Sequence, residues 1–348
     1  MSPWITSILL ASLGLGTTTT FASSHWLLAW MGLEISTLAI IPLMAQQHHP
    51  RAVEAATKYF ITQAAAAALL LFATTSNAWI MGEWQIQHLS HPLALTITVL
   101  ALALKVGIAP LHFWLPEVLQ GLDLKIGLIL STWQKLAPMI LIFQLAPSMN
   151  PNLLIGMAIT STLVGGWGGL NQTQLRKIMA YSSIAHMGWM MAIIKFYPKL
   201  MVFNLAIYII MTTAVFLTLD MLYSTKISTL SMMWSKTPVL MATTLLAMLS
   251  LGGLPPLTGF MPKWMILSEL TKQDLPLTAT VLALTALLSL FFYLRLCYAT
   301  ALTAGPSTSN NKTAWRAKSM NPNMPLSTMM TLSLFGLPMA PMAMSLLT

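Results

Sequence analysis

The chain has 348 residues, of which 56% are hydrophobic and only 7% are charged. Soluble domains carry about 25% charged residues, so this composition indicates an integral membrane protein without a separate soluble domain. The net charge of +9 comes from Lys and Arg scattered between apolar stretches, which argues against a nucleic-acid-binding patch. The single cysteine, Cys297, excludes disulfides, Cys-ligated iron–sulfur clusters and thiolate zinc sites within the chain.

Long apolar stretches follow one another along the whole chain. A helix needs about 20 apolar residues to cross the hydrocarbon core of a bilayer. On this basis the sequence predicts an all-α membrane protein with eleven transmembrane helices, at residues 4–22, 26–44, 54–78, 93–113, 124–145, 151–170, 174–195, 199–223, 238–268, 276–302 and 325–346.

Basic residues are distributed unequally between the loops on the two sides of the predicted helices. Ten follow even-numbered helices: Arg51, Lys58, Lys125, Arg176, Lys177, Lys226, Lys236, Lys312, Arg316 and Lys318. Only three follow odd-numbered helices: Lys195, Lys199 and Lys272. The positive-inside rule therefore places the N-terminus and the even-numbered loops on the inner face, and the C-terminus on the opposite face.

Two apolar stretches are interrupted by Gly and Pro at matching positions. They are KVGIAPLHFWLPEV at residues 105–118 and LGGLPPLTGFMPKW at residues 251–264, and Gly107 aligns with Gly253 as Pro110 does with Pro256. Gly and Pro weaken or break helices, so we expect helix breaks at these four residues and at Pro255. Paired breaks in two halves of a membrane protein point to a transporter's working centre, although chance similarity is the simpler alternative.

The broken fourth and ninth helices are five apart, so they enter the membrane from opposite sides. This predicts two inverted five-helix repeats within a single transmembrane domain, over residues 1–148 and 149–303. A polar loop over 304–324 and a last helix over 325–348 complete the predicted organisation.

Several ionisable residues fall within the apolar spans or the breaks: Glu34, Lys105, Lys135, Lys263, His112 and His186. A charge at mid-bilayer costs about 2.5–3.5 kcal/mol on insertion scales, so such residues are functional candidates. Their structural alternatives are a lysine extended to the interface, a hydrogen-bonding carboxyl, or a histidine used for packing.

Opposite charges make Glu34 and Lys105 natural partners, because pairing relieves two desolvation costs. Lys135 and Lys263 have no comparably deep carboxylate, so waters and His112 or His186 are expected between them. Desolvation disfavours the charged form of a lysine, and a neighbouring carboxylate favours that form. A lysine under both influences can take up and release a proton when its partner moves, so the residues support a proton relay along the membrane midplane. Haem ligation by His112 and His186 is the weaker alternative because both are isolated. The pair His48–His49 in an inner loop is a weak metal signal, and the sequence shows no phosphate loop, dinucleotide fingerprint, nucleophile triad or redox site.

Four segments carry a family resemblance over essentially the whole chain. The chain resembles the antiporter-like membrane subunits of mitochondrial respiratory complex I, the NADH:ubiquinone oxidoreductase, in their short animal form. The segments are GLEISTLAIIPL at 32–43, LKVGIAPLHFWLPEVLQG at 104–121, QTQLRKIMAYSSIAHMGWM at 172–190 and SLGGLPPLTGFMPKW at 250–264.

The resemblance implies that Glu34 pairs with Lys105, that Lys135 is the central lysine and that Lys263 belongs to the second broken helix. It implies proton translocation across the inner mitochondrial membrane, driven by ubiquinone reduction elsewhere in the complex. This chain would hold no cofactor, with FMN, iron–sulfur clusters and ubiquinone bound by other subunits. The sequence departs from the larger family by lacking three helices of fourteen, at the N-terminal end.

The implied partners are other membrane-arm subunits, including related antiporter-like ones, together with phospholipids such as cardiolipin. The N-terminus would face the matrix and the C-terminus the intermembrane space. Two alternatives stay open. The chain could be a non-conducting scaffold of the same membrane arm, or a stand-alone sodium/proton antiporter, for which Glu34 is the only deep carboxylate.

Overall fold

The computed structural model describes residues 2–46, 49–303 and 324–347, and most of them are helical. Within these ranges there is no β-strand, and only two isolated bridges join extended residues. The chain forms two compact units, Met1–Ser161 and Thr162–Thr348. The predicted repeat boundary between 148 and 149 stays a prediction, and the predicted polar loop lies largely outside the described residues.

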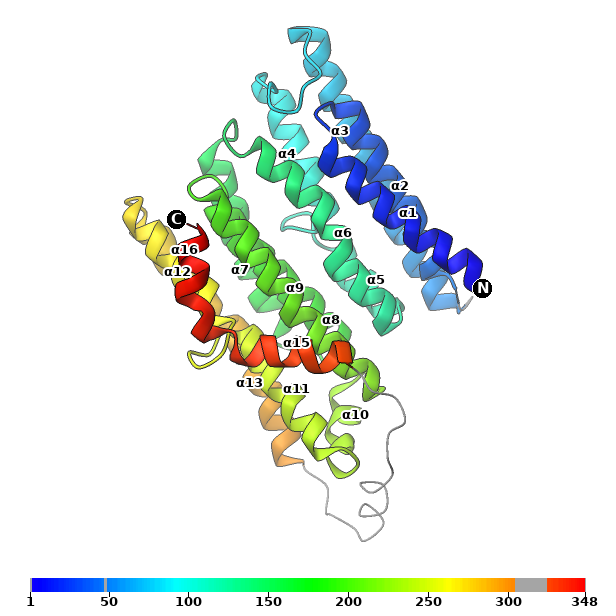
Figure 1. Cartoon of the computed structure of the whole chain (residues 1–348), viewed down its shortest axis with the longest axis vertical. Helices are drawn as coiled ribbons and strands as arrows, with labels where there is room; N and C mark the ends of the chain where they lie inside the picture. The colour runs from blue at the N-terminus through cyan, green and yellow to red at the C-terminus, as the bar shows by residue number, and fades with distance from the viewer. Residues whose placement is uncertain (1, 47–48, 304–323, 348) are drawn as a thin grey trace. The chain divides into compact units, whose positions relative to one another are not determined.

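In the described ranges 2–46 and 49–161, the first unit has six helices and the start of a seventh. They are α1 (Pro3–Ala22), α2 (Trp26–Met44), α3 (Pro50–Met81), α4 (Pro92–Val106), α5 (Trp114–Gly121), α6 (Leu124–Leu145) and α7 (Pro151–Gly169), which continues into the second unit (Figure 1). Proline stands in the first turn of α1, α3 and α4. Its fixed φ suits a helix start, where its missing N–H leaves no hydrogen bond unmade.

The second unit contains the other helices of the described residues. They are α8 (Leu175–Ile193), α9 (Pro198–Met221), α10 (Ile227–Met232), α11 (Pro238–Gly252), α12 (Phe260–Lys272), α13 (Pro276–Leu302), α15 (Met324–Phe335) and α16 (Ala340–Leu347), with short 3₁₀ helices at Met233–Ser235 and Leu337–Met339. The sequence did not predict α10, which is a helix of six residues, half of them polar, between the apolar helices α9 and α11.

Six helices of the described part are long and apolar enough to cross a membrane: α1, α2, α3, α6, α9 and α13. Three shorter apolar helices are α4, α11 and α15. Two of these, α4 and α11, are short because they end at the predicted breaks, Gly107 and Gly253. The fold is therefore all-α and multi-pass, while the count of eleven spans and the inverted repeat stay predictions.

Helices α1 and α2 lie side by side in the first unit at very short range (Figure 1). A β-carbon added to Gly16 would lie 2.8 Å from the carbonyl oxygen of Gly32, and one added to Gly32 would lie 2.8 Å from the carbonyl oxygen of Gly16. Small residues at a helix crossing allow such close backbone approach within membranes. This contact fixes the position of α2, which carries Glu34 half a turn further on.

The C-terminal part differs from the single predicted helix over 325–348. Helix α15 ends at Phe335, and Gly336 and a 3₁₀ turn separate it from α16. Pro338 and Pro341 lack the N–H that a continuous helix needs, so the break follows from the sequence FGLPMAP. Helix α15, red in Figure 1, packs against α9 and α11 of its own unit.

Candidate functional site

The two predicted helix breaks have the same backbone conformation. Helix α4 ends at Gly107 with φ of 83°, and α11 ends at Gly253 with φ of 84°. Both values lie in the left-handed region that glycine occupies without steric cost and that commonly ends helices. The structure thus places a break at each of the two glycines that the sequence selected.

Hydrogen bonds repeat in the two breaks at a constant offset of 146 residues. The first break contains the backbone bonds Ile108 to Ala103, Leu111 to Ile108 and Leu115 to His112, and the second contains Leu254 to Leu249, Leu257 to Leu254 and Met261 to Thr258. Three backbone hydrogen bonds at matching positions are more than a shared content of Gly and Pro would produce. The sequence similarity between 105–118 and 251–264 therefore reflects a shared local fold rather than chance.

Each break leaves carbonyl groups at a helix end without their usual helical partners, and a side chain compensates in each. In the first break the indole Nε1 of Trp114 donates to the Leu104 carbonyl at 3.0 Å. In the second, Lys263 Nζ donates to the Gly252 carbonyl at 2.7 Å. A helix C-terminus carries partial negative charge, which favours a donor or a cation at this place. The second break thus holds its lysine directly at the end of α11.

Glu34 and Lys105 form an ion pair between α2 and α4. Lys105 Nζ lies 3.4 Å from Glu34 Oε1, and the side chain of the lysine is 1% exposed against 23% for the glutamate. Lys105 also occupies the last turn of α4, where the helix dipole favours a cation. The predicted pairing of these residues is present in the structure.

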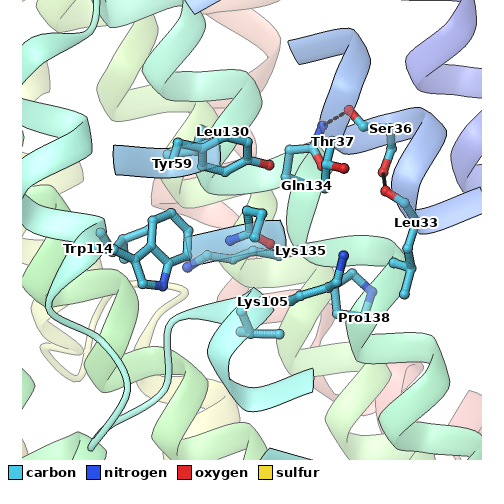
Figure 2. Close-up of a pocket in the computed structure, with 13 residues that line it drawn as sticks. Leu33, Ser36, Thr37, Tyr59, Lys105, Trp114, Leu130, Gln134, Lys135 and Pro138 are labelled. Atoms are coloured by element: carbon cyan, nitrogen blue, oxygen red, sulfur yellow. Dashed lines mark hydrogen bonds between the residues drawn. The ribbon is translucent and has the colours of Figure 1, made fainter. Parts of the chain in front are cut away.

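Lys105 and Lys135 line one small cavity inside the first unit. Its walls come from α2, α3, α4, α5 and α6 and consist of Leu33, Ser36, Thr37, Tyr59, Gln63, Lys105, Val106, Trp114, Leu115, Leu130, Gln134, Lys135 and Pro138. The cavity has room for about one water molecule. In Figure 2, Tyr59 and Trp114 stand on one side and Ser36 and Thr37 on the other.

Polar side chains of this cavity are tied to the surrounding helices. Gln134 Nε2 on α6 donates to the Ser36 carbonyl on α2 at 3.2 Å, and the Ser36 hydroxyl donates to the Leu33 carbonyl at 2.8 Å (Figure 2). The first bond joins α6 to α2 beside Lys135, and the second lies within α2. The lining of the cavity is thus a mixture of polar and apolar side chains, and it includes two of the four charged residues of the predicted relay, Lys105 and Lys135.

A second cavity lies inside the second unit, next to the second break. It is lined by Ser182, Ala185, His186, Trp189, Lys263, Ser289 and Tyr293, from α8, α12 and α13. His186 is buried, and its ring centroid lies 5.5 Å from that of Tyr208. The structure therefore brings His186 and Lys263 together, as it brings Lys105 and Lys135 together in the other unit.

His112 is buried in the first break, with its ring 4.3 Å from that of Phe113. Its Nδ1 has no hydrogen-bond partner among the described residues, and the histidine does not line the cavity of Lys105 and Lys135. Its predicted part in a relay stays a prediction.

Sequence reasoning missed the neutral residues of both cavities, chiefly Tyr59, Gln63 and Gln134 in the first and Tyr293 in the second. One signal was available. Tyr59 and Gln63 are four residues apart on α3, so they share a helix face, and that face is buried. Among the described residues, no group of three or more His, Cys, Asp or Glu side chains could hold a metal ion.

Several long apolar helices, together with two shorter ones that end at paired glycine breaks beside buried lysines, suit a membrane protein of the antiporter-like class. Residues 23–289 match the family model described as NADH:quinone oxidoreductase/Mrp antiporter, and residues 290–344 match that of the NADH dehydrogenase subunit 2 C-terminus.

Close relatives over the full chain identify the particular family. NADH-ubiquinone oxidoreductase chain 2 is 67% identical in Carassius auratus, 64% identical in Salmo salar and 60% identical in Scyliorhinus canicula, each over 100% of both chains. The chain belongs to the family of NADH-ubiquinone oxidoreductase chain 2, an antiporter-like subunit of respiratory complex I that takes part in proton translocation. It is thus a multi-pass protein of the mitochondrial inner membrane.

Solved structures share the fold. A chain of respiratory complex I from Thermus thermophilus is 27% identical with a TM-score of 0.82, and the match covers 98% of this chain and 80% of that one. A chain of the Mrp complex from Dietzia is 16% identical with a TM-score of 0.83, covering 97% and 75%. The second likeness shows the fold alone, and both solved chains are longer than this one.

Proposed function

We propose that this subunit carries protons through two sites of buried ionisable residues. The first consists of Glu34, Lys105 and Lys135, and the second of Lys263 and His186. The observation that carries the proposal is the first cavity, where the ion-paired Lys105 and a second buried lysine line the same enclosure beside a helix break. Buried ionisable groups in a membrane protein are expensive and mark ion and proton pathways.

Proton transfer at the first site depends on the Glu34–Lys105 pair. While the carboxylate lies beside Lys105, it stabilises the ammonium form against the cost of burial. When Glu34 moves away, the charged amine loses its partner and releases a proton toward the neutral amine of Lys135. One N–H bond breaks at Lys105 and one forms at Lys135. Moving one charge against 100 mV costs about 2.3 kcal/mol, and the energy is supplied by ubiquinone reduction elsewhere in the complex.

The second site works through a lysine held at a helix end. Lys263 Nζ donates to the Gly252 carbonyl in either protonation state, and the partial negative charge of the α11 terminus favours its ammonium form. His186 lines the same cavity and offers a second proton-accepting group. A shift of α12 relative to α11 would change the environment of the lysine and therefore its affinity for a proton.

We further propose that the N-terminus faces the matrix and the C-terminus the intermembrane space. The excess of Lys and Arg in the loops after even-numbered predicted spans supports this orientation. The exposed apolar residues of the spans suit phospholipids, including cardiolipin, and other membrane-arm subunits as neighbours. FMN, iron–sulfur clusters and bound ubiquinone belong, in this proposal, to other subunits.

Replacing each buried lysine with methionine tests the proposal. We expect complex I that contains Lys105→Met, Lys135→Met or Lys263→Met to assemble and to translocate fewer protons per NADH oxidised. The reason is that methionine keeps the length of the side chain but cannot carry a proton. Proton uptake and NADH oxidation are measured together in proteoliposomes that contain the isolated complex.

Lys272→Met is the matched control, because this lysine is 71% exposed and pairs with Glu269 outside both cavities. It is expected to leave the proton-to-electron ratio unchanged. If the three buried-lysine variants assemble and also keep the full ratio, the chain is a non-conducting scaffold. Sodium flux by the isolated chain in liposomes would instead favour a stand-alone antiporter.

A further inference from the structure

Gln63 lines the cavity of Lys105 and Lys135, and no motif or charge marked it in the sequence. It lies on α3, four residues after Tyr59, and its side chain is buried. Its Nε2 is a buried donor with no hydrogen-bond partner among the described residues. Buried polar atoms without a partner are rare in native proteins, and each calls for an explanation.

The size and lining of the cavity supply that explanation. It has room for about one water molecule. A buried water needs about 2–4 polar partners, and the lining residues Gln63, Lys105, Lys135 and Thr37 offer them. Two lysine amines in one enclosure disfavour a cation, whereas water accepts from an amide donor and from an ammonium group alike.

We propose that Gln63 holds a single water molecule that joins Lys105 to Lys135. The Gln63 Nε2–H donates to the water oxygen, and the water completes the path between the two amines. This inference rests on the proposed function, since it assigns the group that carries a proton between two residues of the relay. Gln63 is a positioning residue, because it acts on the proton through the water.

The transfer balances without any further reactant. The ammonium group of Lys105 gives a proton to the water oxygen, and the water gives one of its own protons to the neutral amine of Lys135. One N–H bond breaks, one N–H bond forms, and the water is regenerated. An amide suits the positioning role because it does not ionise, so it orients the water without retaining the proton.

The test is Gln63→Met in the assembled complex, with Gln144→Met as the matched control. Methionine keeps the length of glutamine and removes the donor. Gln144 on α6 also has a buried amide atom without a partner among the described residues, but it does not line the cavity. We expect Gln63→Met to lower protons translocated per NADH oxidised toward the level of Lys135→Met, and Gln144→Met to keep the full ratio.

Two further measurements separate positioning from a purely structural role. The double variant Gln63→Met/Lys135→Met should lose no more proton translocation than Lys135→Met alone, because both changes interrupt the same path. An electron density map that resolves ordered waters should show one at Gln63 Nε2 in the unmodified complex and none there in Gln63→Met.

Full proton translocation by Gln63→Met, or a map without water at Nε2, overturns this inference. In either case the relay itself stands as long as Lys105→Met and Lys135→Met lose translocation. If those two lysine variants keep full translocation, the proposed function fails first.

Discussion

Trp114 stabilises the first break in two ways. Its indole N–H donates to the Leu104 carbonyl at the end of α4, and its ring meets Tyr59 of α3 edge-on, with centroids 5.7 Å apart. Both contacts are made at the wall of the cavity that contains Lys105. Trp114 therefore contacts both the end of α4 and the side of α3, and helps to fix the position of one relative to the other.

Replacing Trp114 with phenylalanine should retain most of the ring contact and remove the donor. The half-buried Leu104 carbonyl is then left without this partner, and its loss should cost about 1 kcal/mol, the lower end of the range for a buried group. We expect a lower midpoint of thermal denaturation for the isolated complex. Trp79→Phe is the control, because Trp79 is 91% exposed. An equal midpoint for both variants would show that the indole bond contributes nothing to stability.

At the residue level, the sequence predicted the charged members of the site but not the neutral ones. Glu34, Lys105 and Lys135 stand out because charge is rare in apolar spans. Gln63 and Tyr59 do not, since amides and phenols occur on many membrane helices without a cavity beside them. Recognising them requires knowing which face of α3 is buried, and packing against α2, α4 and α5 decides that.

The two breaks are alike in backbone but differ in what surrounds their glycines. A β-carbon on Gly107 would have its nearest neighbour, Trp114, at 3.4 Å, which is ordinary contact. A β-carbon on Gly253 would lie 2.9 Å from Lys263 Nζ. Alanine at either position is strained by the positive φ, at about 1–2 kcal/mol, but only at Gly253 would it also displace a lysine.

Gly107→Ala and Gly253→Ala should therefore separate stability from proton transfer. We expect both to lower the thermal midpoint of the complex, and Gly253→Ala alone to lower protons translocated per NADH oxidised. Gly14→Ala serves as the control, because a β-carbon there meets nothing within 4 Å and φ is ordinary. If Gly253→Ala translocates as many protons per NADH oxidised as Gly107→Ala and the unmodified complex, Lys263 tolerates the displacement.

The elements of the fold were largely predictable from hydropathy. The bounds of α2, α6 and α13 match the predicted spans, because uninterrupted apolar length determines a membrane helix. The 32-residue length of α3 and the short helix α10 were not predictable in this way. The residues that α3 has beyond the predicted span, 50–53 and 79–81, and the six residues of α10 are stretches too short to stand out as apolar spans.

Across the whole chain, the end of the sequence returns to the second break. The Thr258 hydroxyl donates to the Ser333 carbonyl of α15, 75 residues later, and both residues are buried. A β-carbon on Gly336 would lie 2.6 Å from Thr258 Cγ2, so the fit is close. Helix α15 is thus anchored to the loop that precedes Lys263.

Thr258→Val should loosen this anchor while preserving the shape of the side chain. The Ser333 carbonyl loses its donor, and we expect faster amide hydrogen exchange over residues 324–335 in the assembled complex. Thr271→Val is the control, since the Thr271 hydroxyl is exposed and bonds only within its own helix. Unchanged exchange in Thr258→Val would show that packing on α9 and α11 suffices to hold α15.

The close crossing of α1 and α2 makes the ion pair sensitive to a change that alters no charge. Alanine at Gly16 or Gly32 would force the two backbones apart, because each β-carbon would meet the opposite carbonyl oxygen at 2.8 Å. Glu34 lies two residues beyond Gly32, and its separation from Lys105 is already 3.4 Å. A methyl group added at Gly16 or Gly32 would therefore move Glu34 away from Lys105 and weaken the ion pair. An inherited substitution at either uncharged position would then have the same effect on Lys105 as the loss of the Glu34 carboxylate.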